Sequence, residues 1–245
     1  MIYLGEWILD KLYRPMTFFF LLPIFYIGIG SAVATQYNTL NIVSLIVLYL
    51  FVLINQMLEN MLLRIPKSDF EISKGFIALL ELANTLVLLY FGLRHSWLAS
   101  LVLLFYTLII QTQFIFSYYN LEDMAIIIAN LLKLVLLNGF AFYIQTQFIH
   151  PRFIPLYFGL YLPFYLFETS RGKTTMGFIW LLSILALSLA AGIGLLWTRI
   201  GMVSLSLLLS LPFAMLFKVE FSRKTSAIFT CVYSLIYLGL ILFFL

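Results

Sequence analysis

The sequence predicts an all-α fold, a polytopic transmembrane helical bundle that forms a single domain over residues 1–245. Hydrophobic residues make up 64% of the chain and the mean hydropathy is +1.08. Charged residues make up 10%, against about 25% in a typical soluble domain. The apolar segments are continuous Leu-, Ile- and Phe-rich runs, which a transmembrane β-barrel, with its short alternating strands, does not have. Because a lipid-exposed backbone must satisfy its own hydrogen bonds, these runs are expected to be helices.

About nine spans are predicted, and short connections between them favour antiparallel neighbours. The sixth and eighth are only about 15 residues long, and Pro163 and Pro212 inside them predict kinks. The predicted spans are 16–34, 40–63, 76–93, 97–118, 124–147, 153–167, 175–197, 202–217 and 225–245.

The basic residues predict the orientation of these spans. Ten Lys and Arg residues fall on the side of the N-terminus and three on the other side, while Lys133 falls inside a span. Cytoplasmic loops are enriched in Lys and Arg, so we expect a cytoplasmic N-terminus and an external C-terminus in an integral, multi-pass membrane protein. Since the basic residues lie between spans, the net charge of +4 is not interpreted as nucleic-acid binding. The single cysteine, Cys231, excludes a disulfide framework.

Polar residues gather near two connections on the predicted cytoplasmic side, 64–75 and 168–174. The second span carries Asn55, Gln56, Glu59 and Asn60 near its end, and Glu168 closes the sixth. Asn55 and Glu59 are spaced i and i+4, on one helical face. The pattern fits either a polar seam that joins helices or the wall of a cavity that holds a cation.

The same residues resemble the motifs of the UbiA family of intramembrane prenyltransferases. Arg14-Pro15 precedes the first span, and Asn55-Gln56-x-x-Glu59 stands where that family has Asn-Asp-x-x-Asp-x-x-x-Asp. Ile72-Ser73-Lys74-Gly75 stands where the family has a short loop motif such as Ile-x-Ser-Gly. The segment from Glu168 to Thr175, with Gly172 and Lys173, is similar to the second motif, Asp-x-x-x-Gly-Lys-x-Thr.

The resemblance implies a membrane enzyme that transfers an isoprenoid from a prenyl diphosphate to a hydrophobic, aromatic or lipid acceptor. Glu59 and Glu168 would be the catalytic acids and would hold Mg²⁺, since a hard cation prefers oxygen ligands. Diphosphate binding would fall to polar and basic residues from both motifs. These are Asn55, Gln56, Arg64, Lys67, Lys74, Arg171 and Lys173.

The sequence departs from the family pattern at three acidic positions. Gln56, Leu63 and Phe164 stand where the family has aspartates, which leaves Glu59 and Glu168 as the motif acids. Two alternatives to an active prenyltransferase therefore stay open. One is a non-catalytic lipid-binding protein of the same fold, and the other is a small transporter or permease component that uses intramembrane polar residues such as Glu81, Asn84, Asn130 and Asn138.

Overall fold

The computed structural model describes residues 15–62, 74–119, 121–169 and 223–244, and within these ranges the regular structure is helical. Three of the described helices are long and apolar enough to cross a membrane: Ile42–Leu62, Lys74–Arg94 and Ala125–Thr146. Shorter apolar helices cover Phe18–Ala34, Trp97–Gln113 and Thr230–Phe243. The expected all-α, multi-pass character is confirmed to this extent. The predicted spans 175–197 and 202–217 lie outside the described residues.

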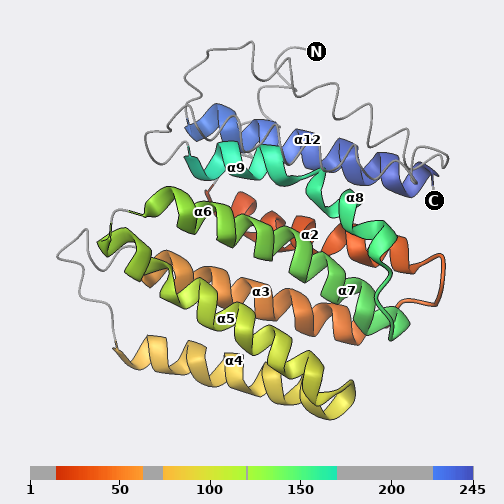
Figure 1. Ribbon diagram of the computed structural model, residues 1–245, viewed down its shortest axis with the longest axis horizontal. Coiled ribbons are helices and arrows are strands. Elements are labelled where there is room, and N and C mark those ends of the chain that lie inside the picture. The colour runs from red at the N-terminus through yellow and green to blue at the C-terminus, as the bar shows by residue number, and fades with distance from the viewer. Residues whose placement is uncertain (1–14, 63–73, 120, 170–222, 245) are drawn as a thin grey trace. The chain divides into compact units, whose positions relative to one another are not determined.

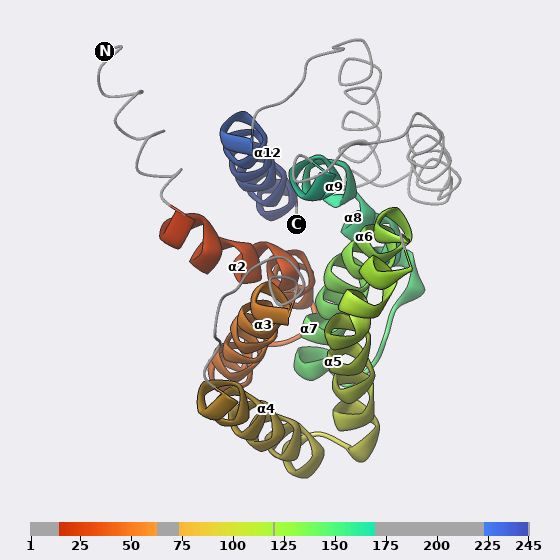
Figure 2. The same cartoon turned by 90° about the vertical axis from the view of Figure 1, so that its left-hand side faces the viewer.

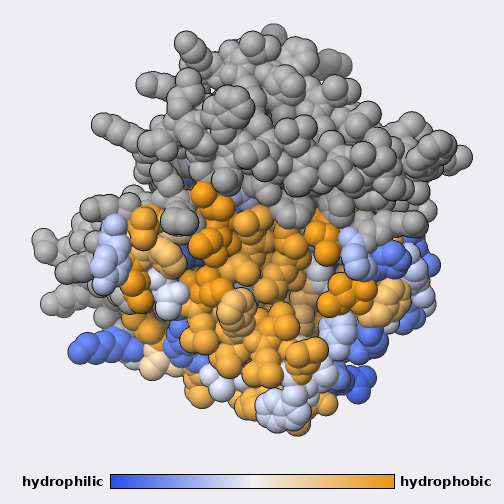
Figure 3. All heavy atoms as spheres, in the orientation of Figure 1, coloured by the Kyte–Doolittle hydropathy of each residue, from blue (hydrophilic) through white to orange (hydrophobic). Residues whose placement is uncertain are grey.

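The chain divides into two compact units, one formed by residues 1–40 and 133–245 (unit 1) and the other by residues 41–132 (unit 2). The described surface is dominated by hydrophobic residues, and hydrophilic residues gather toward the left and right margins of the view (Figure 3). The helices of unit 2 run between these same margins (Figure 1). Apolar flanks with polar ends are the pattern expected of helices that cross hydrocarbon.

Unit 2 contains α3 (Ile42–Leu62), α4 (Lys74–Arg94), α5 (Trp97–Tyr118) and α6 (Glu122–Leu131). Two side chains cap these helices at their beginnings. Asn41 Oδ1 accepts from the Ser44 N–H at the start of α3, and Ser96 Oγ accepts from the Ala99 N–H at the start of α5. The helix α3 contacts α4 and α5, and α5 also contacts α4 and α6. Figure 2 looks nearly along these helices and shows α4 beside α3 and α5.

The core of unit 2 is layered along the helix axes. Leu48, Phe91 and Leu103, from α3, α4 and α5, are completely buried. The rings of Phe51 and Tyr106 pack together in the next layer, with centroids 5.8 Å apart. These apolar layers bury large side chains, which in lipid stabilise the helix contacts through van der Waals packing.

Unit 1 contains α2 (Pro15–Ala34), α7 (Leu137–Thr146), α8 (Ile154–Phe158), α9 (Tyr161–Thr169) and α12 (Arg223–Phe244). The helix α2 contacts α7, while α12 contacts α2 and α9. A five-residue π-helix, η2 (Leu132–Leu136), joins α6 directly to α7, so the predicted span 124–147 is helical up to Thr146. It ends where Gln147 takes a left-handed conformation, with φ 61°, and its N–H bonds to the Tyr143 carbonyl.

The predicted sixth span, 153–167, is interrupted in the structure. A short 3₁₀ turn (Pro151–Phe153) leads into α8, and a turn at Gly159 and Leu160 separates α8 from α9. The interruption lies one turn before Pro163, and Pro163 itself lies within α9. A proline ring clashes with the carbonyl four residues earlier and has no N–H to bond it, so the break falls at Gly159.

Candidate functional site

The strongest concentration of buried polar groups in unit 2 lies where α3, α4 and α5 meet. Asn55 and Asn84 are buried, as is Thr107. Asn55 Nδ2 donates to Asn84 Oδ1 over 3.1 Å, and Asn84 Nδ2 lies 3.4 Å from Thr107 Oγ1. Polar side chains inside a membrane bundle commonly join helices in this way, because hydrocarbon offers no other partner. The polar seam predicted from the Asn55 pattern is present.

A second group of polar residues lies one turn further toward the C-terminal end of α3. Glu59 is 8% exposed, and on the neighbouring helices Gln111 Nε2 donates to Glu81 Oε1 over 2.6 Å. The Asn55–Asn84 bond fixes the register of antiparallel α3 and α4, and this register puts Glu59 and Glu81 at nearly the same level. Two carboxyl groups therefore occupy one level of unit 2.

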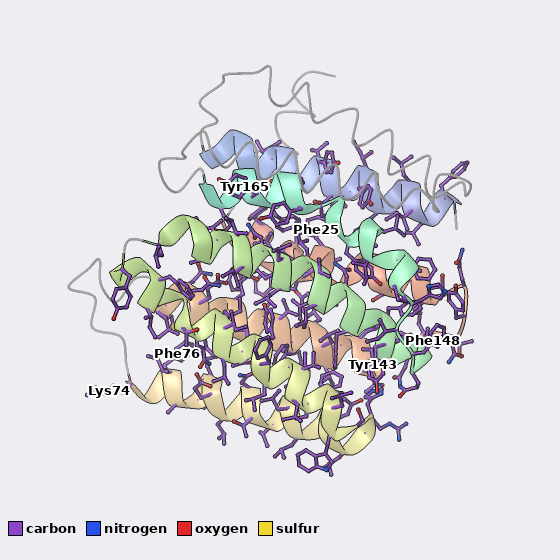
Figure 4. All side chains as sticks on the ribbon, viewed as in Figure 1. Phe25, Lys74, Phe76, Tyr143, Phe148 and Tyr165 are labelled. Carbon is purple, nitrogen blue, oxygen red and sulfur yellow. The ribbon has the colours of Figure 1, made fainter. Side chains whose placement is uncertain are left out.

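Lys74 begins α4 at this same end of unit 2 and is exposed (Figure 4). It is the one basic member of the predicted diphosphate site that falls among the described residues. Arg64, Lys67, Arg171 and Lys173 lie outside them.

Asn55 and Gln56, both predicted as diphosphate-binding residues, are buried and carry acceptor oxygens that have no hydrogen-bond partner in the described structure. These atoms are Asn55 Oδ1 and Gln56 Oε1. Both residues lie one turn before Glu59, at i−4 and i−3, so the three side chains share one face of α3. Mg²⁺ prefers amide and carboxylate oxygens as ligands, and the side chains of these three residues offer such oxygens.

A carboxylate-rich metal site is not visible among the described residues. Over residues 15–62, 74–119, 121–169 and 223–244, no three His, Cys, Asp or Glu side chains come together. Glu168, the second predicted ligand, lies half-buried in the last turn of α9 in unit 1, whereas Glu59 belongs to unit 2. A shared site of Glu59 and Glu168 stays a prediction.

Phe164, one of the three departures from the family motifs, has a clear structural role in unit 1. Its side chain is completely buried. Its ring lies 6.3 Å from the ring of Phe25 and 4.9 Å from that of Tyr26, centroid to centroid. A carboxylate at this position would be buried among aromatic rings at a high desolvation cost. The phenylalanine is thus explained by packing between α9 and α2.

A separate polar group lies at the opposite end of unit 2. Ser44 Oγ is 3.2 Å from Tyr90 Oη and 3.1 Å from His95 Nε2. Burial, and secondarily the positive charge of Arg94, lower the pKa of His95 below its usual value of 6.5. The layer of Leu48, Phe91 and Leu103 separates this group from Asn55 and Glu59.

Several polar residues of these groups escaped the sequence reasoning. Thr107 and Gln111 are spaced i and i+4 on α5, the spacing that places two residues on one helical face. That spacing indicates a shared face, as does the polar run from Gln111 to Gln113, but neither pattern identifies the partner of a side chain. Glu81, Asn84 and Asn130 stood out as intramembrane polar residues, and Glu81 was expected to pair with Lys133 or with an arginine of a loop.

Comparisons of the chain with protein-family models, with curated proteins and with solved structures give no match. The resemblance to the UbiA family is carried by the sequence motifs alone.

Proposed function

We propose that this chain is a UbiA-like membrane protein that binds the diphosphate group of an isoprenoid at the C-terminal end of α3. The observation that carries the proposal is the shared face of Asn55, Gln56 and Glu59, which is buried and holds two amide oxygens without a hydrogen-bond partner in the described part of the chain. Nine spans with a cytoplasmic N-terminus complete the proposed architecture, so that this end of α3 faces the cytoplasm.

The chemistry of the ligand fits this position. An isoprenoid diphosphate combines a multiply charged head with a long apolar tail, and a polar group enclosed by apolar helices can accept both. Glu59, with the amide oxygens of Asn55 and Gln56, would hold Mg²⁺, which neutralises diphosphate charge when bound. Lys74, exposed at the same end of unit 2, supplies a positive charge for the phosphates. Transfer of the prenyl group to an aromatic or lipid acceptor is the activity that the motifs imply.

The non-catalytic alternative shares the binding step and lacks the transfer step. A transporter is less well supported in unit 2, because the apolar layer of Leu48, Phe91 and Leu103 interrupts the polar residues between its two ends. A continuous path for an ion or polar solute requires polar or wet surroundings along its length.

Binding of a labelled prenyl diphosphate to the purified full-length protein tests the proposal, with Mg²⁺ or with a chelator present. We expect saturable binding that the chelator weakens and that Glu59→Gln weakens at least about tenfold, which corresponds to about 1.4 kcal/mol. Asp123→Asn, which removes one acid at the start of α6, is the matched control and should leave binding unchanged. Absence of saturable binding, or equal binding by Glu59→Gln and the wild type, would refute the proposal.

Product analysis with candidate aromatic and lipid-alcohol acceptors separates the two alternatives. A prenylated product that depends on both Glu59 and Glu168 supports the transferase. Saturable binding with no product under any acceptor supports the non-catalytic lipid-binding protein.

A further inference from the structure

Four buried carboxamides in unit 2 share an unusual property: each has at least one polar atom without a hydrogen-bond partner in the described part of the chain. They are Asn55 and Gln56 on α3, Gln113 on α5 and Asn130 on α6, none more than 8% exposed. The unpartnered atoms are Asn55 Oδ1, Gln56 Oε1, Gln113 Nε2, and both Nδ2 and Oδ1 of Asn130. A buried polar atom without a partner carries its full desolvation cost, so native proteins rarely leave several together.

The first three carboxamides lie close to one level of the unit. The contact of Phe51 with Tyr106 fixes the register of α3 and α5, which run in the same direction (Figure 1). Asn55 lies about one turn beyond Phe51, and Gln113 about two turns beyond Tyr106. The axial separation of Asn55 and Gln113 is therefore about one turn.

Asn130, on α6, lies at a similar axial level and is completely buried. The helices α5 and α6 contact each other and are joined by a short connection, so they are antiparallel neighbours. Gln113 lies about one and a half turns before the end of α5, and Asn130 about two turns after the start of α6. These positions again differ by about one turn or less.

The helical period directs Gln113 to the interior. Leu103, Tyr106, Ile110 and Gln113 follow one another at spacings of three or four residues, and all are buried. Tyr106 in this stripe contacts Phe51 of α3. Residues at such spacings share one helical face, so Gln113 is on the face that α5 turns toward α3.

We propose that these four carboxamides form a site for a neutral polar guest that offers both hydrogen-bond donors and acceptors. The unpartnered set comprises three acceptors and two donors, and none of the four side chains is charged. A hydroxyl or carboxamide group complements this set, and water is its smallest member. A diphosphate presents acceptors only, so it cannot itself complete the hydrogen bonds of the amide oxygens. Asn55 and Gln56 also belong to the proposed isoprenoid site, whereas Gln113 and Asn130 belong to this site alone. Substitutions of Gln113 and Asn130 therefore test the guest separately from isoprenoid binding.

The direction of a stability change tests whether a guest is present. Gln113→Leu and Asn130→Leu each replace a carboxamide with an apolar side chain of similar size. If a guest completes the hydrogen bonds, both substitutions lower the Tm of the purified protein, because they remove bonds made to the guest. If the amides are unpaired, both raise the Tm, and this result would overturn the proposal. Asn84→Leu breaks bonds between protein groups and lowers the Tm in either case, which makes it the control for the response of the assay.

Cysteine reactivity gives a second test and identifies the source of the guest. In a Cys231→Ser background, Gln113→Cys and Asn130→Cys should react with N-ethylmaleimide at least about tenfold faster than Leu103→Cys, which lies on the same buried stripe of α5. A rate that is equal in native membranes and after delipidation in detergent indicates water. A rate that rises after delipidation indicates a hydroxyl- or amide-bearing organic molecule that had occupied the site. Rates no faster than that of Leu103→Cys in both preparations would contradict the proposal.

Discussion

The side-chain amide of Asn55 on α3 donates a hydrogen bond to Oδ1 of Asn84 on α4, over 3.1 Å. Both side chains are buried. The bond holds the two helices in one register, and this register brings Glu59 level with Glu81 at one end of unit 2 and Ser44 beside His95 at the other.

Replacing Asn84 is expected to loosen unit 2. Asn84→Leu removes the acceptor for Asn55 and the donor for Thr107, so the free energy of unfolding should fall by about 1–3 kcal/mol. Denaturant unfolding in detergent measures the change. Thr85→Val is the control, because Thr85 is exposed and its hydroxyl bonds only within α4, to the Glu81 carbonyl. An Asn84→Leu protein as stable as the wild type would contradict this role.

Gly30 is expected to be intolerant of any side chain. Its N–H lies 3.0 Å from Asn138 Oδ1, and a Cβ on Gly30 would overlap the Asn138 backbone carbonyl. Gly30→Ala should therefore separate α2 from α7 and destabilise the protein by about 1–3 kcal/mol or more. Gly239→Ala provides the matched control, since a Cβ there meets no atom within 4 Å. Thermal unfolding measures the Tm of both variants, and Gly30→Ala should have the lower Tm. Equal Tm values would show that α2 and α7 do not pack at Gly30.

Tyr237 and Thr230 on α12 should contribute independently to unit 1. Tyr237 Oη donates to the Leu156 carbonyl and Thr230 Oγ1 to the Pro163 carbonyl, each over 2.8 Å. Tyr237→Phe and Thr230→Val should each cost about 1 kcal/mol. Because the two bonds share no atom and lie about two turns apart, the double variant should show the sum of the single effects. A marked departure from additivity would indicate that the bonds form one coupled network.

Stability should fall as the pH is lowered past the range where His95 titrates. The pKa of His95 is lowered in the folded protein, first by burial and then by Arg94. The unfolded chain therefore binds a proton more readily than the folded chain. The contribution of neutral His95 to stability is complete above the unfolded pKa of about 6.5 and is lost progressively as the pH falls below it.

His95→Asn should reduce this dependence on pH, as measured by Tm between about pH 8 and pH 5. The difference between the two Tm profiles isolates the histidine from the carboxylates that also titrate toward pH 5. Parallel profiles for the variant and the wild type would contradict the assignment.

The two ends of α4 should be accessible from opposite sides of the membrane. In a Cys231→Ser background, Gly75→Cys should react with an impermeant thiol reagent only from the cytoplasmic side, and Trp97→Cys only from outside. Both positions are exposed; Gly75 is the second residue of the helix Lys74–Arg94, and Trp97 lies three residues beyond its end. The reverse pattern would invert the proposed orientation, and labelling of both from one side would exclude α4 as a span.

Local features of the chain determined much of the helical pattern in advance. The predicted spans 16–34, 97–118 and 225–245 differ from α2, α5 and α12 by two residues at most at either end. Such runs are readable because hydrophobicity over about 20 residues is a property of the segment itself. The interruption of the sixth span was also readable from Pro163, although its position one turn earlier required the geometry of the clash at Gly159.

The partners of the polar residues could not be read in the same way. Glu81 was expected to pair with a basic residue, and the structure pairs it with Gln111. Spacing along a helix identifies a shared face, but the partner depends on which helix faces it and on the axial register between the two.

The sequence by itself determined long apolar helices whose polar residues gather at a few positions, the pattern of a membrane protein, because solvent preference and helical period are local properties. The tertiary structure alone decided that Asn55 is bonded to Asn84, whereas Asn130 keeps two unpartnered atoms in the described structure. A hydrogen bond needs two atoms within about 3 Å of each other, and only the packing of one helix against another brings them there.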